Sequence, residues 1–217
     1  AAGMCAAALG SDGGGSIRMP SSFCGIVGLR PTLGRISRHG VLGAGGSMMV
    51  SGPMTRTVED NALMLQALAG YDPRDNYSAN IPVPDYRSHL TGNIQGLKIG
   101  IVNEFLESQT TVPDVRNSVN DAILVLDSLG AKISDVSLPL LPYSGVISAS
   151  LLIEGAYKEH DMRSSMLSDE VGHRTKVEYL TRSIQIFLPK IMSKAYRLRA
   201  LLIEQVEQIM EQVDILI

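Results

Sequence analysis

The sequence predicts an α/β protein, a fold class in which strands and helices alternate along the chain. Residues 97–139 carry this prediction, because a strand pattern, a helix pattern and a second strand pattern follow one another there. Residues 57–70 add a helix with recognisable start and stop signals. The composition agrees, since 45% of the 217 residues are hydrophobic and 19% are charged, which is typical of a globular protein with a substantial core.

The segment before the first clear helix is rich in glycine and small residues. We expect the alanine-rich residues 1–10 to be the tail of a packed helix, and residues 23–32, FCGIVGLRPT, to form a short strand. The glycine run GSDGGGSIRMP at residues 10–20 would then be a loop between two buried elements. Residues 34–53 are expected to be irregular and closely packed, because glycines interrupt them throughout.

The helix over residues 57–70 is expected to begin at Thr57, with Asp60 three residues on as its capping partner, and to close at Gly70. The proline-rich residues 71–96 follow as a long surface connection, either a functional loop or a hinge. No regular element is expected there.

The remainder of the chain combines α/β and helical patterns. The segment LKIGIV predicts a strand, Pro113 begins a helix, and AKISDVSLP predicts a second strand. Residues 145–187 contain mixed helical patterns, and a last long helix is expected over about residues 189–212. The chain starts without a helix cap or initiator methionine and stops inside an apolar strand pattern, so we expect an internal piece of a longer protein.

The charge pattern favours a small-molecule substrate. The formal net charge is -3, and the lysines and arginines are scattered, so no direct nucleic-acid contact is expected. No apolar run is long enough to span a bilayer, and no membrane contact is expected. Cys5 and Cys24 are expected to be free thiols in a reducing, cytoplasmic compartment, with Cys24 buried as a small packing residue. A homodimer is left open.

The glycine run raises the question of what bare backbone at Gly13, Gly14 and Gly15 is for. A phosphate-binding P-loop needs a lysine before its serine, and none is near. A dinucleotide loop follows a strand, whereas this loop follows a helix-like pattern, so that interpretation is weak. Amides without β-carbons beside them can instead converge on one point, as in the oxyanion hole of a serine nucleophile. A plain tight turn is the structural alternative.

Longer motifs resemble the amidase signature family. The core Asp-x-Gly-Gly-Ser-x-Arg, a Phe-Cys-Gly, the segment Arg-Pro-Thr-x-Gly-Arg and the turn Gly-Pro-Met-x-Arg occur in the family's order. The likeness is strong over residues 1–75 and looser beyond. It implies a mixed β-sheet covered by helices on both faces, in a single but incomplete amidase signature domain. The expected parts of residues 1–217 are a signature core at 1–70, a connecting loop at 71–96 and an α/β and helical remainder at 97–217.

The resemblance places the family's site on one loop. Its residues would be the catalytic Ser16, the oxyanion hole of Gly13, Gly14 and Gly15 with the Ser16 amide, and the supporting pair Asp12 and Arg18. The family's catalytic lysine and cis-serine are expected upstream of residue 1. Without them a serine hydroxyl is an ordinary alcohol, so the chain by itself is expected to be almost inactive. No metal or organic cofactor is implied.

Three functions follow from these observations. We favour an amidohydrolase that cleaves a carboxylic amide through a serine acyl-enzyme. The alternative within the family is the A subunit of a glutamine-dependent tRNA amidotransferase, although such members carry an aspartate where this chain has Met49. Met48 and Met49 would instead form an apolar substrate wall or fill the core. The third function is that of a non-catalytic homologue or fragment acting as a binding module.

Overall fold

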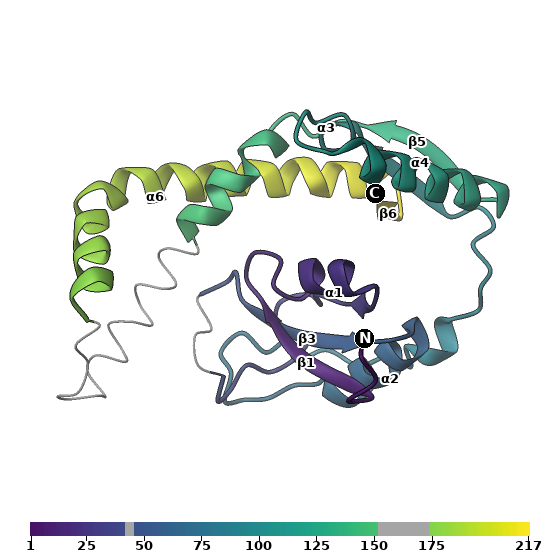
Figure 1. Cartoon of the computed structure of the whole chain (residues 1–217), viewed down its shortest axis with the longest axis horizontal. Coiled ribbons are helices and arrows are strands. Elements are labelled where there is room, and N and C mark those ends of the chain that lie inside the picture. The colour runs from purple at the N-terminus through teal and green to yellow at the C-terminus, as the bar shows by residue number, and fades with distance from the viewer. Residues whose placement is uncertain (42–45, 152–173) are drawn as a thin grey trace. The chain divides into compact units, whose positions relative to one another are not determined.

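The computed structural model describes residues 1–41, 46–151 and 174–217 (Figure 1). The chain divides into two compact units. The first contains Ala1–Thr91 together with described residues of Ser148–Leu188, and the second contains Gly92–Ile147 and Pro189–Ile217. The first boundary falls inside the proline-rich connection expected at residues 71–96.

The first unit is built on a small antiparallel sheet. Its strands are β1 (Ala7–Asp12), β2 (Val27–Gly28) and β3 (Val50–Thr55), in the order β1-β3-β2. The helix expected over residues 1–10 is wrong, because the alanine-rich end of that segment pairs with β3 from Ala7↔Thr55 to Asp12↔Val50. Alanine has the highest helix propensity, but propensity is a weak determinant, and strand pairing overrides it here.

A helix, α1 (Arg18–Cys24), follows the glycine run. It ends at Gly25, whose left-handed φ of 60° suits a glycine that terminates a helix. The strand expected over residues 23–32 is therefore wrong for most of its length, since only β2 pairs. Cys24 closes α1 and is exposed, so its expected burial is also wrong; Cys5 and Cys24 are both free thiols.

The helix α2 (Val58–Leu68) confirms the prediction for residues 57–70. The Thr57 hydroxyl accepts a hydrogen bond from the Asp60 amide at 3.1 Å. The buried Asn61 side chain donates to the Pro53 carbonyl at 3.3 Å and to the Thr55 hydroxyl at 3.1 Å, which ties α2 to β3. Figure 1 shows α1 and α2 on opposite faces of this sheet.

Glycines occupy the face of the sheet that packs against α1. A β-carbon at Gly10 would lie 2.9 Å from Ile17 Cγ1, and one at Gly28 would lie 2.2 Å from the Ser21 hydroxyl. At Gly52 it would lie 2.2 Å from the Leu29 carbonyl oxygen, which belongs to the backbone. These glycines allow α1 and the following loop to lie directly on the strands.

The second unit is the strand-helix-strand unit predicted from the sequence. Its elements are β4 (Lys98–Val102), α3 (Asn103–Leu106), α4 (Pro113–Ser128), β5 (Lys132–Val136) and β6 (Ile215–Leu216), in a parallel sheet of order β5-β4-β6. Ile99, Ile101 and Ala131 form its buried core, against which Ile123 and Leu126 of α4 pack. The α/β fold class is confirmed.

The long helix α6 (Arg174–Met210) begins earlier than the expected residue 189. The expected start, Pro189, lies inside this helix. A proline there removes only one backbone hydrogen bond, and the helix continues through it. Its Leu202, Val206 and Ile209 pack on the cluster of Val102, Leu138 and Leu141. Two short 3₁₀ turns, η1 (Arg87–His89) and η2 (Leu141–Tyr143), are also present, and residues 144–151 are helical. Of the helical pattern expected at 145–187, the part at 152–173 lies outside the described residues.

Within the described ranges, no helix combines the length and apolar character needed to cross a bilayer.

We expect Gly52→Ala to destabilise the protein by about 1–3 kcal/mol, because its β-carbon meets a backbone oxygen that cannot rotate away. Thermal unfolding followed by circular dichroism would measure the loss. Gly145→Ala is the matched control, since a β-carbon there has no neighbour within 4 Å. An equal melting temperature for Gly52→Ala and the unaltered protein would contradict the close approach.

Candidate active site

The loop Gly13–Ser16 connects the end of β1 to the residue before α1. Ser16 is exposed, while Gly13 and Gly15 are buried. The next residue, Ile17, is fully buried and packs on the glycines of the sheet, so it anchors the loop there. Gly15 has a φ of 122°, which side-chain-bearing residues rarely adopt, so its conformation requires glycine. The serine hydroxyl is thus presented to solvent on a loop whose two flanks are anchored.

A fully buried carboxylate, Asp12, organises this loop from within. Asp12 Oδ1 accepts a hydrogen bond from the Gly15 amide at 2.7 Å. Asp12 Oδ2 accepts bonds from the Ile17 amide at 3.3 Å and from the Arg18 amide at 3.4 Å. One side chain therefore sets the path of the backbone on both sides of Ser16.

Two arginines neutralise Asp12. Arg18 Nε donates to Asp12 Oδ2 at 2.9 Å and Arg18 Nη2 donates to Oδ1 at 3.1 Å, which is the ion pair expected from the sequence. Arg30 Nε lies 3.5 Å from Asp12 Oδ1. Arg30 was not predicted from the sequence, because no local spacing links it to the loop. Two-point contacts such as that of Arg18 fix a carboxylate in orientation as well as in charge.

The electrostatic effect of these contacts is visible at both partners. Burial acts to raise the pKa of Asp12, but hydrogen bonds from the Arg18 side chain and from the Gly15 and Ile17 amides lower it to about 2. The same contact with Asp12 raises the pKa of Arg18 above its ordinary value. Asp12 is therefore an anion at every physiological pH and is not a candidate proton acceptor.

The amides of the loop are divided between two directions. The Gly15 amide is bonded to Asp12. The amides of Gly13, Gly14 and Ser16 form no hydrogen bond with the described part of the chain. Within the same part, the Ser16 hydroxyl has no hydrogen-bond partner. The loop thus presents a hydroxyl and unengaged amide donors next to one another.

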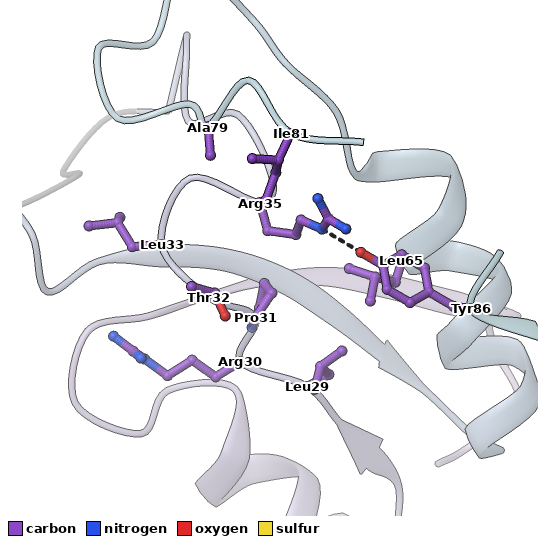
Figure 2. Close-up of a pocket in the computed structure, with 10 residues that line it drawn as sticks. All are labelled: Leu29, Arg30, Pro31, Thr32, Leu33, Arg35, Leu65, Ala79, Ile81 and Tyr86. Carbon is purple, nitrogen blue, oxygen red and sulfur yellow. Dashed lines mark hydrogen bonds between the residues drawn. The ribbon is translucent and has the colours of Figure 1, made fainter. Parts of the chain in front are cut away.

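The first unit also contains an open pocket of about 500 Å³, whose lining includes none of Gly13–Ser16 but does include Arg30, which also contacts Asp12. The ten residues that line it are Leu29, Arg30, Pro31, Thr32, Leu33, Arg35, Leu65, Ala79, Ile81 and Tyr86 (Figure 2). Figure 2 shows Arg35 and Tyr86 turned toward each other, joined by a hydrogen bond from Arg35 Nε to the Tyr86 hydroxyl. The lining offers no carboxylate, cysteine or histidine, so the serine loop is the better candidate for chemistry.

Comparison with known sequences connects the chain to one family. The model of the family described as Amidase matches residues 1–217. The chain is 40% identical over 239 residues to the A subunit of glutamyl-tRNA(Gln) amidotransferase of Geobacillus sp. (strain WCH70), covering 100% of this chain and 49% of that protein. Similarity to the corresponding protein of Desulfatibacillum aliphaticivorans is 49% identity over 143 residues, covering 66% and 30%. The chain spans about half the length of the curated relatives that align along all of it.

Solved structures show the same relationship. The A subunit of glutamyl-tRNA(Gln) amidotransferase from Thermotoga maritima superposes with a TM-score of 0.83 at 29% identity, covering 98% of this chain and 46% of that one. A bacterial aryl acylamidase of the amidase signature enzymes superposes with a TM-score of 0.80 at 23% identity, over 96% and 44%. The second likeness concerns the fold alone.

We expect Asp12 to stabilise the fold at neutral pH by on the order of 2 kcal/mol, because its pKa is about 2 in the fold and 3.8 ordinarily. This stabilisation is complete above pH 3.8 and is lost as the pH falls toward 2. Denaturant unfolding at a series of pH values would show the loss. In Asp12→Asn the stability at pH 7 should drop and this part of the pH dependence should disappear. Asp121→Asn, an exposed change on α4, is the control, and a matching loss there would contradict the assignment to Asp12.

Proposed function

The chain belongs to the amidase family, and we propose that it contains the nucleophile of an enzyme that cleaves a carboxylic amide, with Ser16 as the residue that accepts the acyl group. The observation that carries this proposal is the exposed Ser16 hydroxyl on a glycine loop whose backbone is held by the buried Asp12. The buried Asp12, paired with Arg18 and close to Arg30, fixes the loop in one conformation, as donors that are held in place before a reaction require.

In the proposed reaction, Ser16 Oγ attacks the amide carbonyl carbon and its proton leaves with the departing nitrogen. The C–N bond breaks, ammonia or an amine is released, and an acyl ester remains on Ser16. Water then hydrolyses the ester and returns the proton to the hydroxyl. The chain's own contribution is to place the hydroxyl and to stabilise the negative charge on the carbonyl oxygen in each tetrahedral state.

The unengaged amides of Gly13, Gly14 and Ser16 are the donors we propose for that oxygen. The Gly15 amide, expected from the sequence to join them, would have to leave Asp12 first. We therefore propose for Gly15 mainly a conformational role, set by its φ of 122°. Donors held in place before the reaction need no reorganisation when charge develops, which is the usual source of their effect.

Proton removal from Ser16 needs a base that is absent from its described surroundings. His39 is exposed, and His89 lies in η1 with its ring nitrogen against the Asp85 carbonyl. The lysine and cis-serine of the family remain the proposed relay, located in the part of the protein upstream of residue 1. On this proposal the chain is almost inactive by itself and active as part of the complete protein.

A second candidate is the A subunit of a tRNA amidotransferase, which the relatives named for that function favour. Those names associate these relatives with tRNA(Gln), so the expectation of no nucleic-acid contact finds no support in the comparisons. Met49 in place of the aspartate of such members favours the free-standing amidase. A non-catalytic binding module is the third candidate. A cytoplasmic location and a small amide substrate complete the proposal.

Ser16→Ala in the complete protein should reduce amide turnover by several orders of magnitude, since the acyl ester cannot form. The melting temperature should stay nearly unchanged, because Ser16 is exposed and its hydroxyl makes no hydrogen bond within the described chain. Ser11→Ala, an exposed serine on β1, is the control and should retain activity. Turnover by purified Ser16→Ala would refute the nucleophile.

Ammonia release by the purified complete protein should distinguish the two family functions. A free-standing amidase is expected to hydrolyse apolar carboxylic amides without any partner, and to act poorly on glutamine. An amidotransferase component is expected to co-purify with its partner proteins and to release ammonia from glutamine. Partner-dependent glutamine hydrolysis would replace our first proposal with the second.

A further inference from the structure

The segment Gly46–Met49, which we call the wall segment, lies beside the serine loop. It leads directly into β3, whose first residue, Val50, pairs with Asp12 at the end of β1. The strands are antiparallel, so the residues that precede Val50 and those that follow Asp12 leave the sheet at the same end of the two strands. Gly13–Ser16 and the wall segment are therefore neighbours through strand register.

Arg30 connects the two neighbours. Its Nη2 donates to the Met48 carbonyl at 2.8 Å, and its Nε lies 3.5 Å from Asp12 Oδ1. The wall segment is thus tied to the same carboxylate that sets the path of the serine loop. A displacement of this segment would therefore disturb, through Arg30, the carboxylate that sets the path of the loop beside Ser16.

Arg38 holds the wall segment at both ends. Its side chain is only 5% exposed. Arg38 Nη1 donates to the Gly46 carbonyl at 2.7 Å and to the Met49 carbonyl at 2.8 Å. A single planar nitrogen therefore serves two backbone acceptors three residues apart, which closes the segment into one fixed shape.

Arg38 is itself bound by residues of the connection that follows α2. The Arg38 backbone amide donates to Asp75 Oδ2 at 2.8 Å, and the side-chain Nε of Arg38 lies 3.8 Å from the same oxygen. The guanidinium carbon lies 4.4 Å from the centre of the Tyr77 ring, at cation–π distance. A buried ion pair is weak evidence for a role in stability, because the cost of desolvation offsets the attraction; the contacts of Arg38 to two carbonyls fit a role in orienting the wall segment.

We propose that Arg38 is a positioning residue, which fixes the wall segment beside Ser16 so that Met48 and Met49 favour substrates with an apolar acyl group. This inference rests on the proposed function of Ser16. Met48 and Met49 are both half-buried, and methionine adapts its shape to apolar ligands. Loss of Arg38 should therefore slow the reaction of substrates with large apolar acyl groups much more than the reaction of substrates with small ones.

The test uses two fluorophosphonates, one with an ethyl and one with a dodecyl chain, on the complete protein. Each reacts with an activated serine when the hydroxyl oxygen gives up its proton and bonds to phosphorus, and the P–F bond breaks to release fluoride. The unaltered protein should label at Ser16 faster with the dodecyl probe. In Arg38→Met this preference should fall by about tenfold or more, with ethyl labelling nearly retained. Arg87→Met, an exposed arginine paired with the exposed Glu59, is the matched control and should keep the preference.

Three results would overturn the inference: equal slowing with both probes, an unchanged preference in Arg38→Met, or no preference in the unaltered protein. If Arg38→Met does not fold, Arg38→Lys keeps the charge near Asp75 but offers one ammonium to two carbonyls and the ring, and should lose part of the preference.

Amide hydrogen exchange of a peptide that contains Met49 and Val50 separates this inference from the function on which it rests. Exchange should be faster in Arg38→Met than in the unaltered protein and in Arg87→Met, and equal rates would overturn the positioning role. A Ser16 that takes neither probe in the unaltered protein would contradict the proposed nucleophile, whereas the exchange rates would still decide whether Arg38 fixes the segment.

Discussion

The buried carboxylate of Asp12 is the interaction on which the first unit depends. It lies at the end of β1 and receives hydrogen bonds from amides on both sides of Ser16. Without a partner, a charge in that position would cost several kcal/mol of solvation. Arg18 and Arg30 supply the opposite charge, so three segments of the chain meet at one anion. The conformation of the glycine loop is thereby coupled to the fold.

A second set of contacts extends this arrangement outward. Arg30 and Arg38 donate hydrogen bonds to backbone carbonyls of the wall segment before β3. Asp75, in the connection after α2, in turn accepts a hydrogen bond from the Arg38 amide. The Ser37 hydroxyl donates to Asp72 Oδ2 at 2.8 Å, and the Ala79 amide donates to the Gly34 carbonyl at 3.0 Å. Irregular backbone needs such partners, because it lacks the ladder of bonds that a strand or helix provides. The proline-rich connection is therefore a structural part of the first unit as well as a link.

The family match includes both units of the chain. The family model and the Thermotoga maritima structure cover the chain almost end to end, across both the antiparallel and the parallel sheet. The same comparisons show that relatives are about twice as long. The glycine loop with its buried anion lies within the part that this chain shares with those relatives.

Local signals in the sequence were enough to specify several elements. Thr57 and Asp60 mark the start of α2, Pro113 marks the start of α4, and the apolar run after Leu97 becomes β4. The ion pair between Asp12 and Arg18 could be expected as well, because the two residues are close along the chain and flank the glycines.

Other features became apparent only in the folded chain. Ala7–Asp12 is a strand because β3 lies beside it, and the residues after Ser16 form a helix that reaches Cys24. Arg30 and Arg38 support the loop and its neighbour through contacts to Asp12, Met48 and Met49. Helix periodicity and capping act within a few residues, so a sequence displays them directly. Strand pairing and arginine-carbonyl contacts join residues that are distant along the chain, and folding alone brings these residues together.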